Sequence, residues 1–93
     1  MIKTSPKTRQ TTFRISLPDA ESVSLLGDFN NWDKDAHPMK KNKKGEWRVA
    51  MKLEEGVYQF RYLVDGEVWR NDDDVPIVQN AFGTDNSVAT IRF

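Results

Sequence analysis

Hydrophobic and polar positions alternate along several short segments of the chain. The clearest is the segment 57–64, where Tyr58, Phe60 and Tyr62 share one face and Arg61 faces the other way. Alternation with a period of two is typical of a β-strand with one buried face. The same pattern predicts further strands over 13–17, 23–27, 47–53, 67–70 and 87–93, and a short strand near Met39.

The order of these segments indicates the fold class. No stretch of useful length has the roughly 3.6-residue period of a helix, and turn-forming residues separate the strands. Asp65 and Gly66 predict a tight hairpin, because glycine tolerates the positive φ of a primed turn. We therefore expect an all-β sandwich of about seven antiparallel strands. It should form a single domain over 11–93, preceded by a flexible, polar and basic arm over 1–10.

The three tryptophans fall in different contexts. Trp47 has the parity of the core residues of its strand, whereas the hairpin places Trp69 near Arg61 on the outward face. Trp32 lies in a polar loop over 28–38, so it is either exposed or folded back as a plug over the open end of the sandwich. Of the other aromatics, we expect Phe29 to cap a core that contains Phe13, Tyr58, Phe60, Tyr62 and Phe93.

The amino-acid composition excludes several classes of function. Lys and Arg number 14 and Asp and Glu number 14, so the net charge is +0 and the chain lacks the basic character of a non-specific nucleic-acid binder. The absence of cysteine excludes disulfides and thiolate metal sites. We expect no membrane span and no secretory signal, and therefore a cytoplasmic location. Aromatic residues make up 11% of this hydrophilic chain, so the contacts of the rings matter for its function.

An exposed pair of indoles beside a guanidinium suits a sugar ligand. The apolar C–H face of a pyranose stacks on an aromatic ring, and its hydroxyls need the donors and acceptors that Arg, Asn and Thr supply. Exposed aromatics with arginine also suit single-stranded nucleic acid. Zero net charge and the acidic triplet 72–74 count against that second partner.

We identify no catalytic, metal-binding or cofactor-binding group in the sequence. Asp72, Asp73 and Asp74 are consecutive, so they cannot face each other across a glycosidic bond as a glycosidase requires. The triplet lacks the alternating spacing of a calcium loop, and a solvated loop is the simpler interpretation. His37 is the only histidine, and no second ligand accompanies it. The lysine-rich segment 40–44 predicts a solvated hairpin tip, and nothing in the pattern supports an acidic partner for it.

Three separated motifs resemble one family. The run LLGDFNNW at 25–32 looks like the opening signature of the glycogen-binding carbohydrate-binding modules, the early-set domains of isoamylases, glycogen branching enzymes and the β subunit of AMP-activated protein kinase. The runs GVYQFRYLVDG at 56–66, followed by Trp69, and NAFGTDNSV at 80–88 agree with that family in order and spacing. The resemblance covers residues 11–93 and implies an immunoglobulin-like β-sandwich.

The resemblance also implies sugar contacts at six positions. In the kinase modules, two tryptophans are stacking platforms, an apolar residue wedges against the glucan, and three polar residues form hydrogen bonds with the sugar. In this chain the corresponding residues are the platforms Trp32 and Trp69, the wedge Phe82, and the hydrogen-bonding residues Arg61, Thr84 and Asn86.

The chain departs from the kinase modules in three ways. Arg61 stands where those modules have lysine, and Phe82 stands where they have leucine. The hairpin before Trp69 is one residue longer, because both Glu67 and Val68 precede the tryptophan.

Two functions follow from the resemblance. The first is non-catalytic binding of α-1,4-linked glucan, such as glycogen, starch or maltooligosaccharides. The second is a protein-interaction module that docks on or regulates a glucan-active enzyme or kinase without holding sugar. Solvent access to Trp32 and Trp69 on one face favours the first function, and burial of both favours the second.

Overall fold

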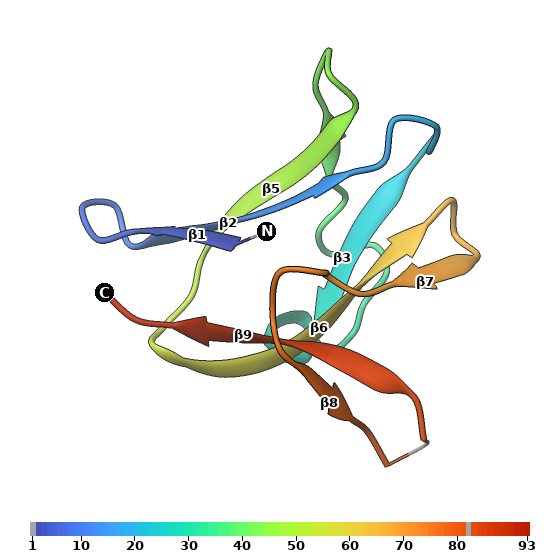
Figure 1. Cartoon of the computed structure of the whole chain (residues 1–93). Coiled ribbons are helices and arrows are strands. Elements are labelled where there is room, and N and C mark those ends of the chain that lie inside the picture. The colour runs from blue at the N-terminus through green and yellow to red at the C-terminus, as the bar shows by residue number, and fades with distance from the viewer. Residues whose placement is uncertain (1, 82) are drawn as a thin grey trace.

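Two antiparallel β-sheets pack face to face in the computed structural model, which describes residues 2–81 and 83–93 (Figure 1). One sheet has the order β1-β2-β5-β4. The other has the order β3-β6-β9-β8, with β7 paired to the end of β6. The expected all-β sandwich is therefore confirmed. The strands are β1 (Ile2–Ser5), β2 (Gln10–Ser16), β3 (Val23–Gly27), β4 (Lys40–Lys41), β5 (Glu46–Lys52), β6 (Gly56–Val64), β7 (Val68–Arg70), β8 (Ile77–Gln79) and β9 (Asp85–Ile91), and a 3-10 turn, η1 (Asp28–Asn30), follows β3.

Two of these strands, β1 and β8, are not expected from the sequence pattern. Residues 2–5, which we expected in a flexible arm, form β1 and pair with β2 from Ile2 opposite Phe13 onward. Ile2 also packs against the core. Strand β8 lies within the segment 71–86, which we expected to be a long loop, and it pairs with the start of β9. Both are edge strands of three or four residues, too short for an alternating pattern to stand out from the surrounding polar residues.

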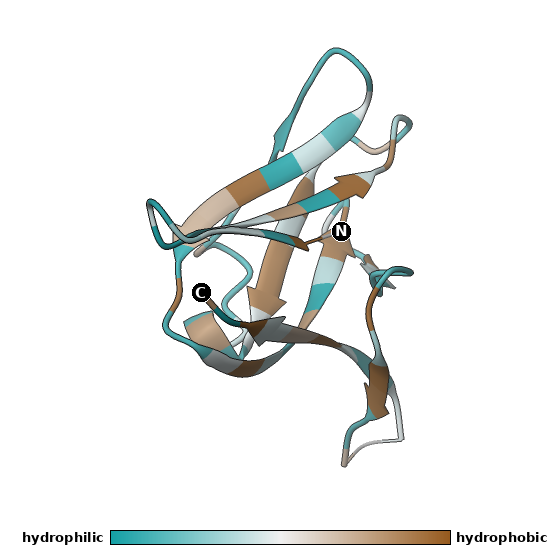
Figure 2. Cartoon of the chain, turned by 60° about the vertical axis from the view of Figure 1, so that its left-hand side comes forward, coloured by the Kyte–Doolittle hydropathy of each residue, from teal (hydrophilic) through white to brown (hydrophobic). Residues whose placement is uncertain are grey.

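Aromatic side chains from both sheets form the core. Phe13 and Trp47 come from one sheet and Phe60 and Tyr62 from the other, and all four are buried. The rings of Phe13 and Phe60 meet edge to face with centroids 5.1 Å apart, a favourable arrangement for aromatic pairs. The indole of Trp47 donates to the carbonyl of Leu17 at 2.9 Å, so its polar group is satisfied. The alternation that predicted these strands is visible as bands of hydropathy along the ribbons (Figure 2).

Asp72 belongs to a buried polar network rather than to a solvated loop. The hydroxyl of Tyr62 donates to Asp72 Oδ2 at 3.0 Å, and the backbone N–H of Asp72 donates to Ser87 Oγ at 2.8 Å. Our interpretation of the acidic triplet is therefore wrong for Asp72, although Asp73 and Asp74 are exposed. Burial, and then the charge of Asp72 and its hydrogen bond, raise the pKa of Tyr62. The network ties the loop after β7 to the middle of the second sheet.

Candidate functional site

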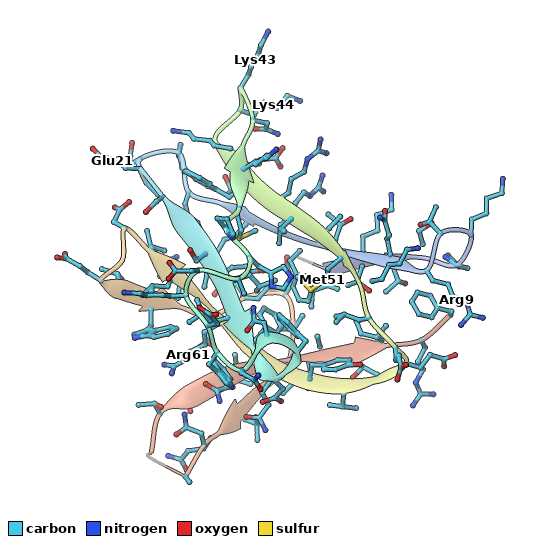
Figure 3. All side chains as sticks on the ribbon, turned by 180° about the vertical axis from the view of Figure 1, so that it is seen from behind. Arg9, Glu21, Lys43, Lys44, Met51 and Arg61 are labelled. Carbon is cyan, nitrogen blue, oxygen red and sulfur yellow. The ribbon has the colours of Figure 1, made fainter. Side chains whose placement is uncertain are left out.

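An open groove crosses the outward face of the sheet that contains β6. Its volume is about 360 Å³. Three segments far apart in the sequence line it: the β3–β4 connection, β6, and the β8–β9 hairpin with the start of β9. Figure 3 shows Arg61 on the outer side of this sheet. The lining residues are Asp28, Trp32, Gln59, Arg61, Asn80, Ala81 and Asn86.

The loop that carries Trp32 is shaped by its own asparagines. The side chain of Asn30 accepts from the backbone N–H of Gly27 at 3.1 Å and donates to the carbonyl of Leu25 at 2.9 Å. Asn31 and Trp32 then both adopt positive φ, at 56° and 57°. Asparagine tolerates this left-handed conformation, whereas it costs a bulky residue such as tryptophan about 1–2 kcal/mol. Backbone strain at a bulky surface residue is characteristic of binding sites.

Phe29, and not Trp32, closes the end of the core. The ring centroid of Phe29 lies 5.6 Å from that of Phe13, and Phe29 packs against the core as we expected. Trp32 is half-buried and contributes to the lining of the groove. The interpretation of Trp32 as a plug over the sandwich is thus not needed to explain its position.

Asp28 joins the Trp32 loop to β6. Its Oδ1 accepts from the indole N–H of Trp32 at 3.3 Å, and its Oδ2 accepts from the backbone N–H of Gln59 at 2.8 Å. Hydrogen bonds to an ionised acceptor are stronger than those between neutral groups. One carboxylate therefore holds the indole and the neighbouring strand in a fixed relation.

Arg61 lies between the two indoles. Its guanidinium carbon is 4.4 Å from the ring centroid of Trp69 and 5.8 Å from that of Trp32. Both distances fit cation–π contacts, each of which contributes about 0.5–2 kcal/mol. The Nε atom of Arg61 is buried and has no hydrogen-bond partner among the described residues.

Trp69 reaches the same face because of the register of the β6–β7 hairpin. Val64 pairs with Val68, so the loop comprises the three residues 65–67 instead of the two residues of a tight turn. Trp69 consequently lies opposite Leu63, one diagonal position from Arg61. Side chains directly opposite each other on neighbouring strands project from the same face. Trp69 is 43% exposed there.

Asn86 carries a second buried polar atom that lacks a partner within residues 2–81 and 83–93. Its Nδ2 donates to Gln59 Oε1 at 3.0 Å, while its Oδ1 is buried without a partner in the described part of the chain. Asn86 Oδ1 and Arg61 Nε are therefore two buried atoms, unsatisfied within the described chain, on residues that line the groove.

The remaining expected positions lie at the β8–β9 hairpin. Thr84 is exposed and does not line the groove; its Oγ1 accepts from Asn80 Nδ2 at 2.7 Å. Asn80 in turn accepts from the backbone N–H of Thr84 at 3.1 Å. Phe82, the expected wedge, lies outside the described residues. The structure thus brings Trp32, Arg61 and Asn86 into one groove with Trp69 beside it, and their roles toward sugar stay predictions.

Sequence reasoning missed four lining residues, which are Asp28, Gln59, Asn80 and Ala81. Gln59 shares the outward parity of Arg61, which was a usable signal. Asp28 and Asn80 act through contacts across loops, and a pattern of alternation carries no information on such contacts. Their positions within two of the family motifs were the only signal available.

No group of three or more potential metal-ligating side chains occurs among residues 2–81 and 83–93. Within the same residues, no helix has the length and apolarity needed to cross a membrane.

Comparison with known proteins gives a consistent result. A family model described as the glycogen recognition site of AMP-activated protein kinase matches residues 9–93. The β-1 subunit of 5'-AMP-activated protein kinase from Sus scrofa is 33% identical over 90 residues, which cover 97% of this chain and 70% of that subunit. Protein FLOURY ENDOSPERM 6 of Oryza sativa is 32% identical over 82 residues, covering 88% of this chain and 15% of that protein. The 1,4-alpha-glucan branching enzyme GlgB of Aquifex aeolicus is 34% identical over 70 residues, covering 73% of this chain and 11% of the enzyme.

Proposed function

Because the chain belongs to the family of the glycogen recognition site of AMP-activated protein kinase, we propose that it binds α-1,4-linked glucan in the groove lined by Trp32 and Arg61. The observation that carries the assignment of the site is the position of Arg61 between two accessible indoles on one sheet face. This arrangement combines stacking surfaces with a hydrogen-bond donor, as a chain of glucose units requires.

The groups in the groove suggest how a glucan is held. Trp32 and Trp69 present ring surfaces to the apolar faces of glucose units, and each stack adds about 0.5–1.5 kcal/mol beyond burial. The side chains of Arg61 and Asn86, which line the groove, would form hydrogen bonds with sugar hydroxyls. Thr84, at the β8–β9 hairpin, would contact the glucan beyond the groove, and the wedge role of Phe82 rests on the family resemblance alone. An open groove of this kind gives dissociation constants of roughly 10 μM to 1 mM.

The proposed role is binding without chemistry. A module of this size would act by keeping itself, or an enzyme or kinase associated with it, on polysaccharide. The chain spans 70% of the kinase subunit but 11% of the Aquifex branching enzyme, so the activities of those proteins are not transferred to it.

The exposure of the indoles favours sugar binding over a purely protein-binding role. Trp69 is 43% exposed and Trp32 is half-buried, so neither is withdrawn into the core. Both rings contact the same guanidinium and therefore lie on one face.

The direct test is a titration with maltoheptaose, followed by tryptophan fluorescence and by backbone amide shifts. We expect saturable binding, with the largest shifts in the loop around Trp32, in β6 near Arg61 and at the start of β9. A β-1,4-linked glucose oligomer of the same length should bind at least about tenfold more weakly, because its extended shape presents rings in a different order. No response at millimolar maltoheptaose would refute the proposed function.

Substitutions then test the site separately from the function. Trp32→Ala should weaken maltoheptaose binding by about tenfold or more. Val57→Ala removes an apolar side chain that is 66% exposed elsewhere on the same sheet, and it should leave binding unchanged. If Trp32→Ala binds like the wild type, the function survives and the site assignment is wrong.

A further inference from the structure

The strands of the other sheet carry a concentration of positive charge that neither the core nor the groove uses. Six of their residues are basic, whereas Glu46 is their one acidic residue within the described chain. The basic residues are Lys3, Arg14, Lys40, Lys41, Arg48 and Lys52. Because the net charge of the whole chain is +0, the acidic residues must be concentrated elsewhere. Figure 3 shows Lys43 and Lys44 extending the same region at the tip of the β4–β5 hairpin.

The register places three of these cations in one row across neighbouring strands. Arg14 lies opposite Arg48, and Arg48 lies opposite Lys40. Like charges directly opposite each other on neighbouring strands destabilise a sheet. Lysines on edge strands are a common protection against aggregation, but β2 and β5 are the two central strands of this sheet. Edge protection therefore does not explain the pairing of Arg14 with Arg48.

The positive charges of this face influence the carboxylate of Glu46. A hydrogen bond from Asn42, and after it the charges of Arg14, Lys44 and Arg48, lower the pKa of Glu46. Arg14 also lines a separate hollow together with the acidic triplet 72–74, so its charge is shared with that loop. The accessible part of the row is accordingly the pair Lys40 and Arg48, both of which are exposed.

A second observation locates a docking position beside these two cations. A hollow of about 440 Å³ lies where β4 begins, and its lining includes Lys40, Arg48 and the apolar side chains of Pro38 and Ala50. Strand β4 pairs with β5 only at Trp47 and Arg48. Beyond that point, the edge of β5 pairs with no other strand in the described part of the chain. A free strand edge can accept an extended segment from another protein.

We propose that this face docks an acidic, extended segment of a partner protein along the free edge of β5, with its carboxylates on Lys40 and Arg48. A membrane surface fits less well, because the large exposed apolar side chains of the described chain all lie on strands of the other sheet. Single-stranded nucleic acid fits less well too, because it requires aromatic platforms. The outward positions of the two central strands are Gln10, Thr12, Arg14 and Ser16 on β2 and Glu46, Arg48, Ala50 and Lys52 on β5, and none of them is aromatic.

The test uses a short synthetic peptide of alternating glutamate and valine, and a matched peptide in which glutamine replaces glutamate. With the full chain, we expect the glutamate peptide to shift the backbone amides of 47–52. The glutamine peptide should bind at least about fivefold more weakly. Added salt should weaken the binding of the glutamate peptide by a similar factor. Equal binding of the two peptides, or no shift along β5 at millimolar peptide, overturns the proposal. Tighter binding of a single-stranded oligonucleotide or of phosphatidylserine vesicles to the same residues also overturns it.

Variants separate this face from the fold and from the groove. Arg48→Gln should weaken the binding of the glutamate peptide by at least about fivefold. Lys34 is an exposed lysine in the β3–β4 connection, and Lys34→Gln should leave that binding unchanged. Arg48→Gln should also raise the melting temperature by about 1–5 °C, because it removes a like-charge pair. A lower melting temperature would mean that Arg48 serves the fold, and it would overturn the proposal. Maltoheptaose binding should be unchanged by Arg48→Gln, so the two proposals fail independently.

Discussion

At the scale of single residues, one carboxylate decides how firmly the Trp32 platform is held. Asp28 accepts from the indole of Trp32 and from the backbone of Gln59. We expect Asp28→Ala to weaken maltoheptaose binding by about 3–10-fold, because it removes both hydrogen bonds and lets the indole move. Fluorescence titration measures the loss, and amide shifts report whether the Trp32 loop has moved.

The matched variant Asp28→Asn keeps an oxygen acceptor for one of the two donors. Its affinity for maltoheptaose should lie between that of the wild type and that of Asp28→Ala. If Asp28→Ala binds sugar as tightly as the wild type, Trp32 is held by the strained loop alone. Asp28 would then have no positioning role.

A second residue-scale prediction concerns Tyr62 and alkaline pH. The pKa of Tyr62 is raised in the folded state, whereas in the unfolded chain the tyrosine releases its proton near pH 10.0. Above that pH the unfolded chain therefore binds fewer protons than the folded one, and stability falls as pH rises. Tyr62 contributes a slope of the free energy of unfolding against pH that approaches about 1.4 kcal/mol per pH unit. Denaturant unfolding at a series of pH values between neutral and strongly alkaline measures it.

Tyr62→Phe should remove this slope. It should also lower stability at neutral pH by about 1–3 kcal/mol, because buried Asp72 loses a hydrogen-bond partner. Tyr58→Phe is the control, since the half-buried Tyr58 hydroxyl donates to the exposed carbonyl of Glu54. A Tyr62→Phe variant with the wild-type slope would contradict the role assigned to Tyr62.

At the scale of elements, the β6–β7 hairpin decides which face Trp69 occupies. Its three-residue loop leaves Leu63 opposite Trp69. Asp65 and Gly66 have φ of 53° and 71°, which already suit a two-residue primed turn. Deleting Glu67 should therefore preserve the pairing, and maltoheptaose affinity should stay within about twofold of the wild type.

Deleting Glu67 and Val68 together should move Trp69 to the inner face. The register would then slip by one residue, which reverses the face of every side chain after the turn. We expect a loss of affinity equal to that of Trp69→Ala, and a loss of the amide shifts of β7 on titration. Full affinity in the double deletion would show that Trp69 takes no part in binding.

The elements that could be predicted from the sequence are those that bury large apolar side chains at alternate positions. Strand β6 buries Phe60 and Tyr62 on one side, so its alternation is strong and Arg61 is correctly placed on the other. Strand β8 has no such contrast, because Ile77 and Val78 are adjacent apolar residues and both are exposed. The extra residue of the β6–β7 loop and the contact of Asp28 with β6 depend on how segments meet in three dimensions. Local pattern carries no signal for either.

At the scale of the whole molecule, the two faces of the sandwich differ in charge. Glucan is neutral, so its binding involves no long-range attraction that salt could screen. We expect the dissociation constant of maltoheptaose to change by less than about twofold between low and high salt, as measured by fluorescence titration. The same series with the glutamate peptide should show a steep loss of affinity. A strong salt dependence of maltoheptaose binding would mean that charged groups of the groove act through more than short hydrogen bonds.

The placement of the groove and the basic face on different sheets of one small sandwich has a consequence for crowded polysaccharide surfaces. The molecule measures 35 × 33 × 23 Å, so a protein segment docked on one sheet would be no more than one molecular width from a glucan chain on the other. Confinement to such a radius corresponds to an effective concentration on the order of millimolar. A partner enzyme tethered in this way would encounter chain ends and branches at a rate set by geometry, even if its own affinity for the polymer were negligible.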